Sequence, residues 1–136
     1  MLGIDPGYDR CGWAITEDTV VIASGCIETS SSSDLPDRYT QLHHDLSQII
    51  NRFHPAVASI EDLYFGKNTK TAIKVAEARG VIVFTCKLLE LAIVMPKPVE
   101  VKSAMTGNGH ASKSEVQSMV ERIVSYADLE YQQRKH

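Results

Sequence analysis

The pattern of apolar residues changes its period near residue 36, and this change restricts the fold more than any other feature. Before it, three short runs rich in Ile, Val, Trp and Thr occupy residues 1–5, 11–17 and 20–28. The last two are separated only by Asp18-Thr19, and the first ends in a Pro-Gly turn. Short β-prone runs joined by turn residues predict a three-stranded antiparallel meander.

Beyond this point the apolar residues recur three and four positions apart, which predicts an amphipathic helix. They are Leu35, Tyr39, Leu42, Leu46, Ile49, Ile50 and Phe53. Pro36 suits the first turn of the helix, and His54-Pro55 ends it. Residues 56–60 then form a short apolar run that ends in Glu61. A strand reached through a helical crossover usually runs parallel to its partner, so this strand is expected to lie parallel to the first one.

The remaining chain continues the alternation of strands and helices. Residues 69–91 predict one long helix through Gly80, because Ala, Lys, Glu and Leu are strong helix formers, although residues 81–85 alone resemble a strand. The further predictions are a strand at 93–95, a short helix at 98–106, a flexible loop at 107–110, a capping box at 112–115 and a helix after it. The whole pattern predicts an α/β fold with a mixed five-stranded sheet flanked by helices.

Composition places the chain among soluble globular proteins. Its 136 residues suit a single domain, 1–136, and 43% are apolar and 23% charged. No apolar run approaches the roughly 18 residues of a membrane helix, and no secretory signal is evident, so no membrane partner and a cytoplasmic location are expected. The net charge of −3 argues against bulk coating of nucleic acid. A DNA enzyme would need its basic residues gathered on one face.

Cysteine usage gives no sign of a disulfide framework or a zinc site. The three cysteines, Cys11, Cys26 and Cys86, are odd in number, widely spaced and without a C-x-x-C pair. We expect them to be reduced thiols in the core.

Two carboxylates stand at the ends of apolar strands, Asp5 after the first run and Glu61 after the fourth. If these strands are parallel neighbours, both acids lie at one edge of the sheet and repel each other unless a cation separates them. Two-metal phosphoryl-transfer sites hold hard cations about 4 Å apart through such oxygen ligands, and Mg²⁺ suits them. The alternatives are that Asp5 only shapes an Asp-Pro-Gly turn and that Glu61 is a solvated strand-end acid.

Five short segments, in this order, carry the most specific signal. They are Gly-Ile-Asp-Pro-Gly at 3–7, Ala-Ser-Ile-Glu-Asp at 58–62, Ala-Arg-Gly-Val at 78–81, Val-Lys at 101–102 and Gly-x-Gly-x-x-Ser-Lys-x-x-Val at 107–116. Together they resemble the RuvC family of Holliday junction resolvases over nearly the whole chain. The resemblance implies an RNase H-like fold, a homodimer, and Mg²⁺-dependent nicking of four-way DNA junctions in recombination and repair, with Mn²⁺ as a substitute metal. It also implies a branch-migration motor complex as a partner.

On this resemblance, Asp5 and Glu61 match the first two metal-binding acids of the family. Lys102 and Lys113 match basic residues that contact the DNA backbone, a role that suits a mobile point charge. Tyr64 lies where the family places an aromatic residue that stacks on bases near the crossover, and stacking of this kind contributes roughly 1 to 3 kcal/mol. Without the resemblance, the two lysines are ordinary surface residues, and Tyr64 packs equally well with its neighbours in the core or a dimer contact.

Lys67 is expected to line the same DNA-binding surface as Tyr64. Lys70 and Lys74 extend the series, and their helical spacing also fits a simple solvated face. The choice between these two interpretations stays open at the level of the sequence.

The end of the chain departs from the family pattern. The family finishes with a helix that supplies the remaining ligands, an Asp or His followed about three residues later by an Asp. Here Lys135-His136 matches the start of that motif, so His136 is the candidate third catalytic residue, unless it is a terminal histidine with no special role. We expect either a fragment that lacks the final helix or a shortened relative that binds junctions without cutting them.

Sugar kinases and actin-like ATPases also open a meander with an acid and a glycine. They require a second domain and further Gly-rich phosphate loops. This chain has neither the length nor a Gly-x-x-x-x-Gly-Lys motif, so this class is disfavoured.

Overall fold

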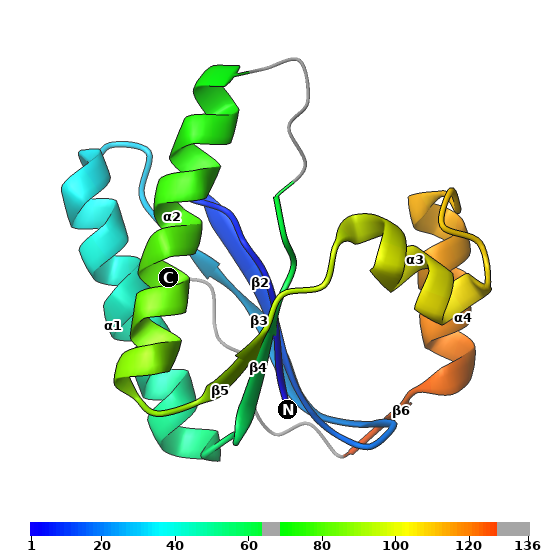
Figure 1. Ribbon diagram of the computed structural model, residues 1–136. Helices are drawn as coiled ribbons and strands as arrows, with labels where there is room; N and C mark the ends of the chain where they lie inside the picture. Colours follow the sequence, from blue (N-terminus) through cyan, green and yellow to red (C-terminus); the bar gives the residue numbers. More distant parts are fainter. Residues whose placement is uncertain (64–68, 128–136) are drawn as a thin grey trace.

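A computed structural model describes residues 1–63 and 69–127, which form a mixed sheet with helices on both sides (Figure 1). The strands are β1 (Leu2–Asp5), β2 (Arg10–Glu17), β3 (Val20–Glu28), β4 (Val57–Ile60), β5 (Ala92–Val94) and β6 (Ser125–Tyr126). The helices are α1 (Leu35–Phe53), α2 (Thr69–Leu88), α3 (Pro98–Thr106) and α4 (Lys113–Ile123). The strand order is β5-β4-β1-β2-β3-β6.

The meander and the parallel crossover are both confirmed. β1 pairs antiparallel with β2, and β2 pairs antiparallel with β3. β4, reached through α1, pairs parallel with β1 in the register Leu2 with Ala58 and Ile4 with Ile60. β5 extends the sheet parallel to β4. The first and fourth strands therefore end at the same edge of the sheet.

Helix α1 begins and ends where the sequence predicts. The Asp34 side chain accepts a hydrogen bond from the Asp37 amide at 3.0 Å, which satisfies one of the unpaired N–H groups of the first turn. At the other end His54 adopts the left-handed conformation, with φ of 48°, and Pro55 follows. The left-handed cap and the proline stop the helix and direct the chain into β4.

Helices α1 and α2 cover one face of the sheet, and the core lies between them and the strands (Figure 1). Fully buried side chains come from both layers: Leu2, Ile27, Leu42, Leu46, Ile60, Ile82 and Cys86. Helix α2 is continuous through Gly80, so the helical prediction is confirmed over the alternative strand at 81–85. The cysteines are free thiols; Cys11 and Cys86 are buried as predicted, but Cys26 is only half-buried.

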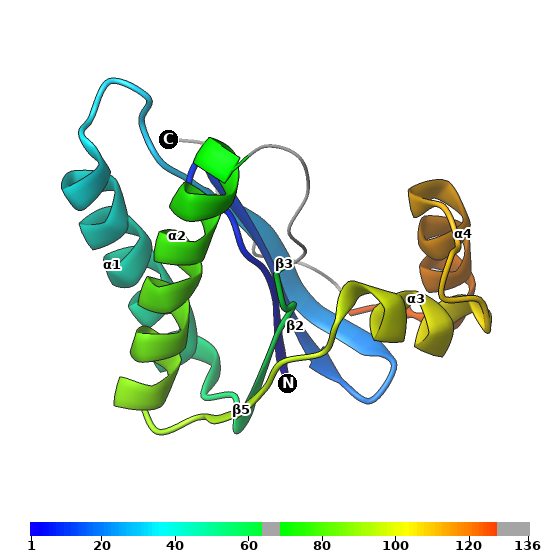
Figure 2. The same cartoon turned by 45° about the horizontal axis from the view of Figure 1, so that its top comes forward.

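Helices α3 and α4 lie on the other side of the sheet from α1 and α2 (Figure 2). Their main contact is with each other. No described residue of either helix is fully buried. The predicted capping box of α4 is present, with Ser112 Oγ accepting from the Glu115 amide at 3.2 Å and Glu115 Oε2 accepting from the Ser112 amide at 2.5 Å.

The prediction of five strands is wrong, because a sixth strand, β6, extends the sheet beyond β3. Ser125 pairs with Val20 and Tyr126 with Val21 in the parallel sense. The Ser125 amide donates to the Thr19 carbonyl and the Ala127 amide to the Val21 carbonyl, both at 3.0 Å. Two residues are too few to show a period of two, so only the edge of β3 makes this segment a strand. Within the described ranges, no helix is long and apolar enough to cross a membrane.

Candidate active site

The register of β1 and β4 brings Asp5 and Glu61 side by side. Ile4 pairs with Ile60, and the next residue on each strand is an acid. The Glu61 amide donates to the Ile4 carbonyl at 3.3 Å, so the pairing continues to the strand ends. The expectation that both acids share one edge of the sheet is confirmed.

The two carboxylates interact unfavourably in the absence of a cation. The pKa of Glu61 is raised, first because partial burial disfavours its charged form and second because of the negative charge of Asp5. The ammonium of Lys102 acts in the opposite direction and lowers this pKa. A cation between the carboxylates would remove the repulsion, and two carboxylates are the hard oxygen donors that Mg²⁺ prefers. The residues at this edge therefore fit a divalent metal.

The face around Asp5 carries small side chains. Leu2 and Ile4 are buried under the helices, so the intervening Gly3 and the following Asp5 project to the opposite face. On this face Asp5 pairs with Gly12, and Gly3 pairs with Ser59 on β4. A Cβ at Gly12 would lie 3.7 Å from the Cβ of Asp5, which is an ordinary contact distance. Small neighbours leave the exposed carboxylate of Asp5 accessible.

The turn after Asp5 is held by α1. A Cβ at Gly7 would lie 2.1 Å from the Arg10 carbonyl oxygen, so this turn requires glycine. Arg38 from α1 forms an ion pair with Asp9 and donates through Nε to Thr29 Oγ1 at 2.9 Å. The Thr29 hydroxyl in turn donates to the Tyr8 carbonyl at 2.5 Å. The Asp-Pro-Gly segment is thus a structural turn that also presents an acid.

Only some of the predicted site residues fall in the described ranges. Lys102, on α3, lies close enough to Glu61 for its charge to lower the pKa of that carboxyl. Lys113 is the first residue of α4 and is exposed, and no contact among residues 1–63 and 69–127 joins it to the acid pair. Three further candidates, Tyr64, Lys67 and His136, lie outside the described residues. Among the described residues, no group of three or more His, Cys, Asp and Glu side chains is arranged to hold a metal.

The contacts of two arginines were not predicted from the sequence. Arg38 is 7% exposed and holds the turn after Asp5, and Arg79 on α2 contacts the segment after Glu61. The available signal for Arg38 was its place four residues before Leu42, on the apolar stripe of its helix. A charged residue on an apolar stripe requires a buried partner.

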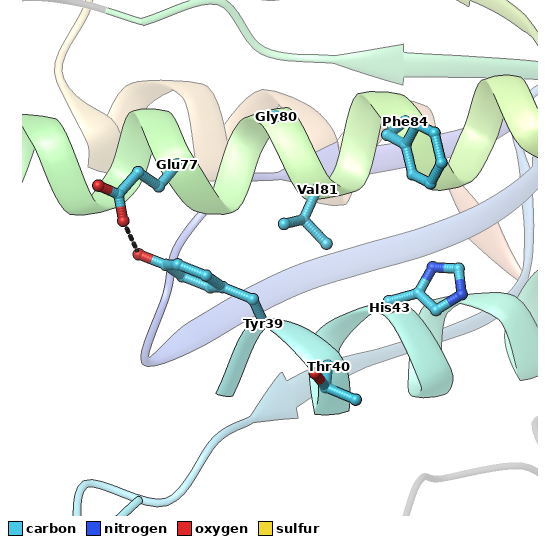
Figure 3. Close-up of a pocket in the computed structure, with 7 residues that line it drawn as sticks. All are labelled: Tyr39, Thr40, His43, Glu77, Gly80, Val81 and Phe84. Carbon is cyan, nitrogen blue, oxygen red and sulfur yellow. Dashed lines mark hydrogen bonds between the residues drawn. The ribbon is translucent and has the colours of Figure 1, made fainter. Parts of the chain in front are cut away.

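A hollow of about 620 Å³ lies away from the acids, between α1 and α2 (Figure 3). Two of its lining side chains bond each other, the Tyr39 hydroxyl donating to Glu77 Oε2 at 2.6 Å, and His43 Nδ1 lies 2.7 Å from Oγ1 of the buried Thr85. Burial and the bonded Glu77 carboxylate raise the pKa of Tyr39 to about 12, so the phenol keeps its proton.

Comparison with known proteins identifies the family. The family model described as "Crossover junction endodeoxyribonuclease RuvC" matches residues 1–133. A protein of that name from Brachyspira hyodysenteriae is 46% identical over 123 residues, covering 88% of this chain and 77% of the relative. Another, from Caldicellulosiruptor saccharolyticus, is 42% identical over 134 residues, covering 95% and 81%.

Solved structures agree with this result. The Thermus thermophilus RuvC structure in complex with a Holliday junction substrate superposes with a TM-score of 0.82 at 26% identity, covering 90% of this chain and 78% of the other. The yeast mitochondrial Holliday junction resolvase has a TM-score of 0.70 at 12% identity, covering 95% and 64%, and this likeness concerns the fold alone. The fold is RNase H-like, as predicted, and the chain belongs to the RuvC family.

Proposed function

We propose that this member of the RuvC family is a Holliday junction resolvase, an endonuclease that nicks four-way DNA junctions. Membership of this nuclease family implies a divalent-metal requirement, and we propose Mg²⁺ as the physiological ion and Mn²⁺ as its substitute. The observation that carries the proposal is the pairing of Asp5 and Glu61 at one sheet edge in a chain that matches the family over residues 1–133.

The residues at the sheet edge would each have a defined task. Asp5 and Glu61 hold the metal, because they are adjacent oxygen donors whose mutual repulsion a cation relieves. When bound, the metal supplies Lewis acidity toward the phosphodiester and its attacking water. Lys102 lowers the pKa of Glu61 through its charge, and we assign it to a backbone phosphate that approaches the acids. We keep His136 as the candidate third catalytic residue.

The DNA surface in this proposal combines a few lysines with one aromatic residue. Lys102 and Lys113 contact the backbone, Lys67 adds charge, and Tyr64 stacks on a base near the crossover. With a net charge of −3, the chain has to rely on these local contacts rather than on its overall charge. Junction binding should therefore weaken as the salt concentration rises.

The exposed side of α2 supports a homodimer. Residues at spacings of four, three, four and four form one exposed stripe on this helix: Ile73, Glu77, Gly80, Phe84 and Leu88. Phe84 is 62% exposed and Ile73 60%, which is unusual for large apolar side chains. Gly80 in the middle of the stripe allows a second helix to approach closely. The same proposal includes a branch-migration motor as a partner and a cytoplasmic location.

A change of Phe84 tests the dimer. Phe84→Glu is expected to convert the dimer to a monomer, because it places a charge at the centre of the apolar stripe, and sedimentation equilibrium would detect the change in mass. Lys87→Glu on the same helix, also exposed, serves as the control and should leave the mass unchanged. A wild-type chain that sediments as a monomer at tens of micromolar would contradict this part of the proposal.

The nuclease assignment is tested with a synthetic four-way junction and a linear duplex of the same sequence. Cleavage of the junction alone, dependent on Mg²⁺ or Mn²⁺ and abolished by Asp5→Asn while junction binding persists, is the expected result. If Asp5→Asn cuts as well as the wild type, the proposed site is wrong.

A second candidate function is a junction-binding relative without catalysis. It is favoured because, in the part of the chain that the structure describes, no third acid, histidine or cysteine is arranged with the pair to hold a metal. Binding to the four-way junction with no cleavage at any Mg²⁺ or Mn²⁺ concentration would establish this alternative.

A further inference from the structure

Arg79 on α2 contacts two segments that border the acid pair. Its side chain is 15% exposed and reaches three acceptors from two loops. Nε donates to the Glu61 carbonyl oxygen at 3.2 Å, and Nη2 lies 3.3 Å from Asp62 Oδ1 and 2.9 Å from Met95 Sδ. The guanidinium therefore joins the ends of β4 and β5 to the helix that covers them.

The first contact restrains the backbone of Glu61. The amide of Glu61 is bound to the Ile4 carbonyl on β1, at the last position of the ladder. Its carbonyl is bound by Arg79 instead of by a neighbouring strand. With both peptide groups held, the direction in which the Glu61 side chain leaves the sheet is restricted, although Arg79 acts through the backbone and not on the carboxylate.

The second contact makes Asp62 part of the scaffold. Oδ1 of Asp62 accepts from the Leu63 amide at 2.8 Å as well as pairing with Arg79. The Asp62 amide donates to the Pro96 carbonyl at 2.8 Å. Asp62 thus connects the end of β4 to the segment that follows β5, and it is held in place by three partners.

The third contact extends this connection to the lysine of the site. Met95 and Pro96 lie immediately before Lys97 and Pro98, where α3 begins, and Lys102 is on α3. By holding Met95 and Asp62 together, Arg79 sets the position of the entrance to α3 relative to Glu61. The guanidinium of Arg79 therefore holds both the segment that carries Glu61 and the segment that leads into the helix of Lys102.

We infer that Arg79 is a positioning residue of the metal site. Through the backbone of Glu61 it sets the direction of the Glu61 side chain, and through Met95 and Asp62 it sets the position of the start of α3 relative to the metal. This inference rests on the proposed role of Asp5 and Glu61 as metal ligands. An arginine is required because its planar fork directs Nε and Nη2 at separate acceptors, whereas a lysine ammonium is a single mobile point. Groups that orient metal ligands typically change metal affinity by about 10- to 100-fold when removed.

The test measures Mn²⁺ affinity of the free protein by electron paramagnetic resonance, without DNA. Arg79→Lys is expected to weaken Mn²⁺ binding about 10-fold, since the cation is kept but the fork is lost. Arg52→Lys is the control: Arg52 lies in the last turn of α1, before β4 begins, and its guanidinium stacks over the Phe53 ring instead of contacting the Glu61 segment. It should leave Mn²⁺ affinity within about twofold of the wild type.

A second pair of variants protects the test against a folding defect of Arg79→Lys. Asp62→Asn keeps the acceptor oxygen for Arg79 and Leu63, and Asp62→Ala removes it, so the two variants differ in contacts at equal charge. Weaker Mn²⁺ binding by Asp62→Ala than by Asp62→Asn, by several-fold, is the expected result. Equal binding by these two variants, or equal loss in Arg79→Lys and Arg52→Lys, would overturn the role of Arg79.

The same titrations separate this inference from the proposed function. If the wild type binds no Mn²⁺, or if Asp5→Asn binds it as tightly as the wild type, the assignment of Asp5 as a metal ligand is wrong. If Asp5→Asn abolishes binding and Arg79→Lys leaves it intact, only the positioning role is wrong.

Discussion

The two faces of the sheet differ in the burial and the type of their side chains, although the same strands contribute to both. On the face covered by α1 and α2, Leu2 and Ile60 are fully buried and Ile4 is 5% exposed. On the other face the alternate residues are small or acidic and at least partly exposed, among them Gly3, Asp5 and Ser59. The period of two places core and site on the same strands without mixing them. Changes on one face should therefore alter stability, and changes on the other should alter function.

The largest expected effect is on the acid face. Asp5→Asn should reduce junction cleavage about 10³-fold, because loss of a metal ligand removes several kcal/mol of transition-state stabilisation. The unfolding free energy should stay within about 0.5 kcal/mol of the wild type, since Asp5 is exposed. Urea unfolding beside the cleavage assay checks both, and a large loss of stability would break the division between the faces.

A neighbouring pair on β4 makes the comparison within one strand. Ile60→Ala is expected to lower the unfolding free energy by about 2–5 kcal/mol, because Ile60 is fully buried under the helices. The Ser59 side chain points to the other face, so Ser59→Ala should change the unfolding free energy by less than about 0.5 kcal/mol. Similar midpoints for the two variants in urea would show that the faces are not energetically distinct.

Substitutions of two glycines compare the faces further, with an expected effect on stability of intermediate size. A Cβ at Gly25 would lie 3.0 Å from Trp13 Cζ2, so Gly25→Ala has to displace the ring and should cost about 1–3 kcal/mol. At Gly12, on the acid face, a Cβ meets Asp5 Cβ at an ordinary 3.7 Å, and Gly12→Ala should be neutral or slightly stabilising. Thermal melts of both variants are sufficient, and destabilisation by Gly12→Ala equal to that by Gly25→Ala would contradict this expectation.

The smallest effect expected is a pH dependence from Glu61, whose pKa is raised by partial burial and by Asp5. The folded chain holds this proton to a higher pH than the unfolded chain does. Metal-free stability should therefore fall as pH rises from the ordinary glutamate pKa, about 4.3, through the raised value. Melting temperatures with and without Mg²⁺ should diverge over this range, and Glu61→Gln should abolish the divergence. If the wild type and Glu61→Gln show the same dependence of melting temperature on pH, Glu61 does not cause the pH dependence.

Local rules were sufficient for most of the secondary structure. Pro36, Asp34 and His54 mark the ends of α1 through capping and backbone preference, which depend only on adjacent residues. The helix through Gly80 follows from the helix propensity of its Ala, Lys, Glu and Leu residues. The parallel partner of β1 follows from the crossover rule.

Contacts between distant residues could not be read in this way. The two residues of β6 form a strand only because β3 offers an open edge. Cys26 is half-buried rather than part of the core because it shares the face of Asp5, through the pairs Asp5 with Gly12 and Gly12 with Cys26. The sequence places Arg79 next to no acid, and only the packing of α2 on the sheet brings it to Glu61 and Asp62.

The sequence by itself determined the family, the alternation of strands and helices, and the two acids at strand ends, because these depend on residue type, spacing and short-range backbone preferences. The tertiary structure decided that the acids are neighbours in register, that Lys102 from α3 acts on Glu61, and that one guanidinium from α2 holds the segment between them. Electrostatic and hydrogen-bond interactions act over a few ångströms in space, and a linear pattern does not contain those distances.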